Sequence, residues 1–124
     1  MKQILIVGIN PHTIDFSLPG FLPGLTAEKV EMGLKAEREN LKAIGCDTDM
    51  YLIDTGVLEL SALAEQLKAK QFNGVMIGAG VRLPPSNFIL FEKLINTVHK
   101  NAPDAKIIFN TNPHDTAASI KRWL

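Results

Sequence analysis

Short apolar runs alternate with amphipathic stretches four times along the chain, and this alternation restricts the possible fold more than any other feature. The apolar runs are too short for ordinary helices and suit strands that are buried on both faces of a sheet. They cover residues 3–7, 49–54, 74–78 and 106–110. Apolar residues at helical spacing predict a helix after each strand. These helices cover residues 27–45, 59–71, 86–101 and 115–124.

Strands that alternate with helices form βαβ units, whose right-handed crossovers produce a parallel sheet. For four strands the most economical order is 2-1-3-4 with helices on both faces, a truncated flavodoxin-like or Rossmann-like arrangement. The length of 124 residues suits one domain. We therefore predict a single α/β domain over residues 1–124.

The charge balance narrows the classes of partner. Thirteen Lys and Arg residues are balanced by thirteen Asp and Glu residues, and the two signs are interspersed. Nucleic-acid binding usually needs a basic surface, so we expect no nucleic-acid partner. The apolar residues 1–7 are far too few for a signal sequence or a membrane span, and the lone Cys46 cannot form an internal disulfide. We expect a cytoplasmic protein with no membrane partner.

One connection is unusually long and unusually apolar. Residues 9–26 join the first strand to the first helix, where about two to six residues are typical. Such a loop either covers a ligand, packs on its own domain, or meets another subunit. We expect most of its large apolar side chains to be buried in one of these ways. They are Phe16, Leu18, Phe21, Leu22 and Leu25.

Candidate site residues gather where the first, third and fourth strands end. Ligands of open parallel sheets bind outside the carboxyl ends of the strands, where the strand order reverses. Here the reversal falls between the first and third strands. The candidate ligand-binding residues are Asn10, Gly78, Ala79, Gly80, Arg82, Asn110 and Asn112, and the candidate catalytic residues are His12 and His114.

The segment after the third strand has the features of an anion site. Gly78 and Gly80 allow a ligand to approach the backbone closely. Arg82 carries a planar guanidinium suited to carboxylate or phosphate, and Ser86 begins a helix whose free N–H groups favour an anion. The alternative is structural: Arg82 pairs with a carboxylate and Ser86 is an ordinary helix cap.

Two matched tripeptides, Asn10-Pro11-His12 and Asn112-Pro113-His114, each follow a strand. Proline restricts its own backbone and that of the preceding residue, so each imidazole is held in a defined direction. We predict that His12 and His114 act as general acid and base, and that both surround one concavity with Arg82. The second tripeptide is equally typical of a helix start. The His and Asp residues nearby match no compact metal site, and we expect no metal.

Standard nucleotide motifs are incomplete in this chain. The third Gly of a dinucleotide fingerprint beginning at Gly78 would fall at Leu83, and no P-loop is present. The order of elements resembles that of response-regulator receiver domains, which carry acidic residues after the first strand and a phosphorylated Asp at the end of the third. Here Gly8-Ile9-Asn10-Pro11 and Gly78 occupy those places. The sequence therefore supports no family, and the cofactor is unknown.

These observations predict a small-molecule binding domain that holds an anionic ligand at the carboxyl ends of the first, third and fourth strands. Whether it is an enzyme stays open. The alternative is a non-catalytic interaction or homodimerisation module that uses the apolar residues 16–25.

Overall fold

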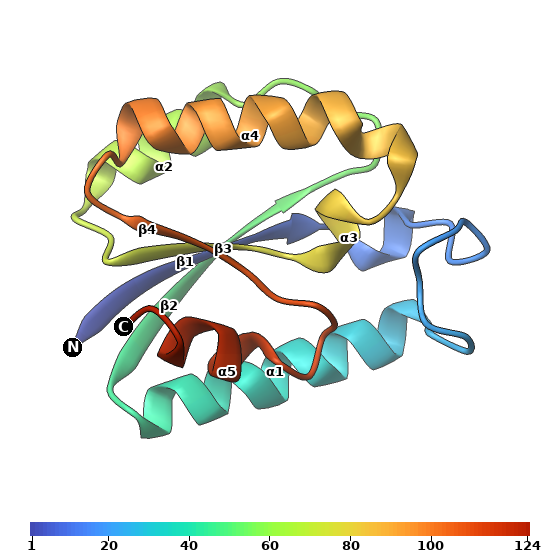
Figure 1. Cartoon of the computed structure of the whole chain (residues 1–124), viewed down its shortest axis with the longest axis horizontal. Helices are drawn as coiled ribbons and strands as arrows, with labels where there is room; N and C mark the ends of the chain where they lie inside the picture. Colours follow the sequence, from blue (N-terminus) through green and yellow to red (C-terminus); the bar gives the residue numbers. More distant parts are fainter.

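Four parallel strands form the centre of the molecule in the order β2-β1-β3-β4, which confirms the predicted sheet (Figure 1). The computed structural model describes residues 1–124. The strands are β1 (Lys2–Ile9), β2 (Cys46–Ile53), β3 (Gly74–Ile77) and β4 (Lys106–Phe109). Because β1 pairs with both β2 and β3, the strand order reverses between β1 and β3.

Helices cover both faces of the sheet (Figure 1). α2 (Ser61–Ala69) and α4 (Phe88–Asn101) lie on one face, and α1 (Ala27–Ala43) and α5 (Thr116–Lys121) lie on the other. Successive β1 side chains point to opposite faces, so Leu5 and Val7 join one core while Ile4 and Ile6 join the other. Two buried faces explain why the β1 sequence is apolar without alternation. None of the helices has the length and hydropathy that a bilayer crossing requires.

Several boundaries differ from the prediction, most clearly at β2 and at the short helical turns. β2 begins at Cys46, three residues early, because Gly45 turns the chain at a φ of +87° straight from α1 into the strand. Two short helical turns directly follow strands and were not predicted: η1 (Pro11–Thr13) after β1 and α3 (Ala79–Arg82) after β3. A further 3-10 turn, η2 (Pro85–Asn87), precedes α4, which therefore begins at Phe88 and not at residue 86.

A buried carboxylate joins α5 to α1. Glu37 lies on the inner face of α1 with only 7% of its surface exposed. Its Oε2 accepts a hydrogen bond from the N–H of Ala117 at 2.8 Å, in the first turn of α5. The first N–H groups of a helix have no partner within the helix, and the helix dipole favours a negative charge there. Glu37 thus provides the cap that α5 does not find in its own sequence.

The free edge of β2 is covered by side chains. Ile53 O accepts a hydrogen bond from the end of β1, so the carbonyls of even-numbered β2 residues point outward. Arg38 of α1 donates to Thr48 O at 3.1 Å, and Gln66 of α2 donates to Met50 O at 3.5 Å. An added strand would need these same acceptors. Edge-to-edge association through β2 is therefore disfavoured.

Candidate functional site

The loops after β1, β3 and β4 meet at one edge of the sheet, and a buried asparagine connects two of them. Asn110, which follows β4, is 5% exposed. Its Oδ1 accepts a hydrogen bond from the N–H of Ala79 at 2.8 Å, and its Nδ2 donates to Thr116 Oγ1 at 3.0 Å. The side chain therefore ties the start of α3 to the start of α5. Both hydrogen bonds of the Asn110 side chain serve this connection.

Arg82, the last residue of α3, makes a second connection between α3 and the end of β4. Its guanidinium donates to the carbonyl of Asn110 and lies 5.6 Å from the centre of the Phe109 ring. Its Nε is buried without a hydrogen-bond partner. No carboxylate pairs with Arg82, so the ion pair that the structural alternative required is not formed. Its contacts instead hold α3 against the end of β4.

The turn between β4 and α5 is fixed by Asp115. The carboxylate accepts hydrogen bonds from the backbone N–H groups of Thr111 and Asn112 and from the Thr111 hydroxyl. Burial alone would raise the pKa of Asp115, but these hydrogen bonds outweigh it and hold the pKa below its ordinary value. The turn packs on α1 at Gly33, where an added Cβ would lie 3.1 Å from Pro113 and 3.2 Å from His114. A side chain at position 33 would therefore require Pro113 or His114 to shift by a few tenths of an ångström.

The two Asn-Pro-His tripeptides adopt the same local structure. In each, the Asn side-chain oxygen accepts a hydrogen bond from the His backbone N–H, at 3.1 Å for His12 and 2.8 Å for His114. The imidazoles nevertheless face different surroundings. His12 pairs with Glu31 of α1 in an exposed groove, and Asn10 Nδ2 donates to Asp54 at 3.0 Å. His114 is exposed beside Gly33.

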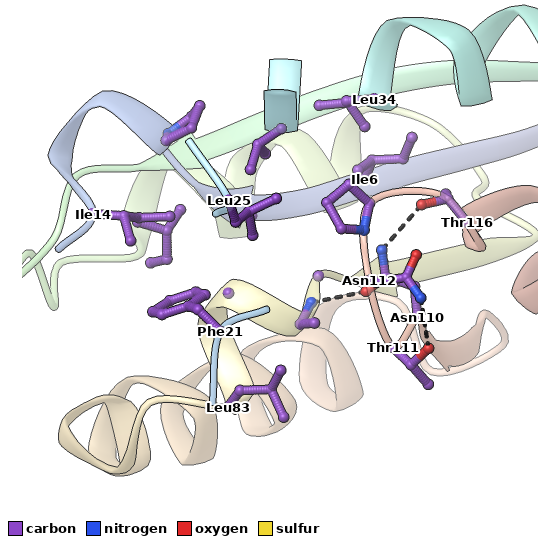
Figure 2. A pocket seen from close by; sticks show the side chains of 18 of the residues that line it. Ile6, Ile14, Phe21, Leu25, Leu34, Leu83, Asn110, Thr111, Asn112 and Thr116 are labelled. Carbon is purple, nitrogen blue, oxygen red and sulfur yellow. Dashed lines mark hydrogen bonds between the residues drawn. The ribbon is translucent and has the colours of Figure 1, made fainter. Parts of the chain in front are cut away.

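A largely apolar cavity lies at this edge, between the ends of the strands and the long loop. The volume of this cavity is about 100 Å³. Figure 2 shows the polar side chains that it labels gathered at one end, with Ile14, Phe21 and Leu83 at the other. This is smaller than the sites of drug-sized ligands, which occupy about 300–1,000 Å³. It is closer to apolar cavities that hold a single ring, such as one of about 150 Å³ that binds benzene.

The long loop covers this cavity. Phe16, Phe21 and Leu25 are partly buried and line it, and the Phe16 and Phe21 rings meet edge to face at 5.3 Å. Leu18 and Leu22 are exposed. The predicted burial of the loop's large side chains thus holds in part, for three of the five. The loop that begins at Ile14 and ends at Leu25 is called the cover loop below.

The cover loop is held to α3 by a close contact at Gly20. This residue has a φ of +103°, a conformation that L side chains rarely adopt. A Cβ at position 20 would lie 3.0 Å from Leu83 Cβ and 3.2 Å from Leu83 O. Glycine is therefore needed here both for its backbone conformation and for its small size.

The structure brings some of the predicted site residues together and separates others. The residues on the cavity lining are Gly78, Ala79, Gly80, Asn110 and Asn112. Asn10, His12, Arg82 and His114 do not line it. No three His, Cys, Asp or Glu side chains lie close enough together to hold a metal ion. The sequence prediction missed the apolar walls, of which Ile14 and Leu34 are examples, although the apolar composition of the long loop indicated a cover of this kind.

Comparison with known proteins gives no family assignment. No protein-family model matches the chain, and no curated protein matches it. The case for function therefore depends on the geometry of the site.

Proposed function

We propose that this domain binds a small molecule in the cavity at the carboxyl ends of β1, β3 and β4, beneath the cover loop. One observation carries the proposal: the largely apolar cavity lies at the switch point of the sheet, where open α/β folds bind ligands. Its walls come from segments far apart in the sequence, including Ile14, Leu34, Gly80 and Thr116.

The proposal is for binding and assigns no acid–base chemistry to the two histidines. A general acid or base must come within hydrogen-bonding reach of the reacting group. His12 is engaged with Glu31 in a separate groove, and His114 lies on the outer side of its turn. A ligand inside the cavity would contact neither imidazole.

A cavity-filling variant tests the proposal. A Cβ at Gly80 would lie 3.6 Å from Ile14 Cδ1, an ordinary contact, so a larger side chain can enter the cavity without a backbone collision. We expect Gly80→Leu to weaken binding at least tenfold in a thermal-shift and ligand-observed NMR screen of fragment-sized molecules of all charges. Gly80→Ala is the matched control and should bind like the wild type. Equal binding by wild type and Gly80→Leu would reject the cavity as the site.

The exposed part of the cover loop favours a second function, an interaction module. Leu18 and Leu22 are 40% and 53% exposed and could meet a second copy of the chain. Stable interfaces bury about 800 Å² per partner, so neighbouring surface would have to contribute. Sedimentation equilibrium distinguishes the two functions. A dimer that Leu22→Ser dissociates supports the interaction module, whereas a monomer at high concentration excludes homodimerisation.

A further inference from the structure

The cavity lining contains no ionisable side chain. None of its 23 residues is an Asp, Glu, His, Lys or Arg, and its polar side chains are those of Asn110, Thr111, Asn112 and Thr116. A charged ligand group in this space would lose its water without gaining an opposite charge. An unpaired buried charge is strongly unfavourable.

Four charged side chains near the cavity have partners outside it. The Arg82 guanidinium is bound to the Asn110 carbonyl, and the Asp115 carboxylate to its own turn. His12 and Glu31 pair with each other in the outer groove. Arg82 and Asp115 would have to give up contacts that hold α3 and the turn before α5 in order to face a ligand. The absence of charge on the lining is therefore maintained in part by contacts of the fold.

The polar end of the cavity offers hydrogen-bond donors. Thr116 lines this end and is fully buried; its hydroxyl accepts one hydrogen bond, from Asn110, and its own hydrogen has no acceptor in the protein. The Asn112 amide donates one hydrogen to Thr111 Oγ1 at 3.3 Å and retains a second. Thr111 is already committed, because its hydroxyl donates to Asp115. A ligand atom at this end is therefore best satisfied if it accepts hydrogen bonds.

From this arrangement we propose that the ligand is an uncharged, mainly hydrocarbon molecule with a hydrogen-bond-accepting oxygen, such as a carbonyl, at the Asn112–Thr116 end. This inference rests on the proposed binding function and replaces the anionic ligand expected from the sequence. The hydrocarbon part would lie against Ile14, Phe21 and Leu83 at the opposite end. A buried acceptor that meets a donor is stabilised, whereas an unmet donor or a buried charge is penalised.

Matched probes that differ in charge and not in ring shape test the inference. The two-ring series is 2-acetylnaphthalene, naphthalene, 2-naphthoate and 2-naphthylmethylammonium, and the one-ring series is acetophenone, benzene, benzoate and benzylammonium. Dissociation constants come from calorimetry and ligand-observed NMR on the full chain. We expect the ketone of the better-fitting series to bind at least tenfold more tightly than both ions, about 1.4 kcal/mol. We also expect it to bind more tightly than the parent hydrocarbon.

Two variants locate the acceptor. Thr116→Val removes the donor and should erase the advantage of the ketone over the hydrocarbon, while Thr116→Ser keeps the hydroxyl and should preserve it. If the carboxylate or the ammonium binds as tightly as the ketone, the inference fails and the binding function stands. If no probe of either series binds, the proposed binding site fails as well. If the ketone's advantage survives Thr116→Val, the assigned position of the acceptor is wrong.

Discussion

Replacing Gly20 by alanine should release the cover loop from α3. An L side chain at the φ of +103° costs roughly 1–2 kcal/mol. The added Cβ also meets Leu83 at 3.0 Å, including backbone that cannot rotate away, and overpacking of this kind costs about 1–3 kcal/mol. The two terms together amount to roughly 2–5 kcal/mol. The loop escapes this penalty by leaving α3, which requires only partly buried side chains to be exposed.

A second glycine of the same loop provides the control. Gly24 has a φ of +78°, but a Cβ there meets only the flexible end of Lys29, at 3.9 Å. Gly24→Ala therefore carries the backbone strain without the collision. The difference between the two variants isolates the contact with Leu83, and we expect it to be about 1–3 kcal/mol.

Amide hydrogen exchange measures the opening directly, because protection reports the free energy of local unfolding. In Gly20→Ala, the protected amides of residues 14–25 should exchange faster than in Gly24→Ala, while those of β1 and β3 should stay protected in both. Equal loss of protection in the two variants would show that the contact with Leu83 does not hold the loop. Faster exchange throughout the sheet would show that the loop is inseparable from the core.

Three further predictions concern the contacts of Arg82, the turn held by Asp115, and the edge of β2. Arg82→Ala removes a hydrogen bond to the carbonyl of Asn110 and should lower the free energy of unfolding by about 1–3 kcal/mol in denaturant titrations without ligand. An unchanged free energy of unfolding would instead favour Arg82 as a ligand anchor. Because the pKa of Asp115 is lowered in the fold, its stabilisation is present above pH about 4 and is lost as the pH falls further. Thr111→Val removes the hydroxyl that donates to Asp115, so the free energy of unfolding should fall less steeply below pH about 4. An unchanged pH dependence would show that this hydrogen bond is not the cause. Arg38→Ala combined with Gln66→Ala should uncover the β2 edge and raise the sedimenting mass with concentration; an unchanged mass would show that these side chains do not protect it.

The sheet could be predicted from the sequence because its determinants are local. Each short apolar run is followed by a helix, and βαβ connections permit few topologies. The same rule placed Gly78, Gly80 and Asn112 at the edge where the cavity lies. Their position follows from strand order alone and needs no knowledge of where a side chain points.

Side-chain direction could not be predicted, because it depends on partners distant in the sequence. His12 is turned by Glu31 on α1, and Arg82 by a carbonyl 28 residues away. His114 lies where Gly33 leaves room for its turn. None of these contacts has a sequence pattern that distinguishes it from the convergent arrangement that we predicted.

If the domain binds a ligand as proposed, the cover loop would link the affinity of the site to the opening of the loop. Phe21 and Leu25 line the cavity, so a ligand there would contact them and bind the closed loop more tightly than the open one. By mass action, such a ligand stabilises the closed state by RT ln(1 + [L]/Kd). Saturating ligand should therefore restore the protection that Gly20→Ala removes, and the variant's affinity should fall by the same factor as its loop opens. A variant that loses protection but keeps full affinity would place the ligand outside the space that the loop covers.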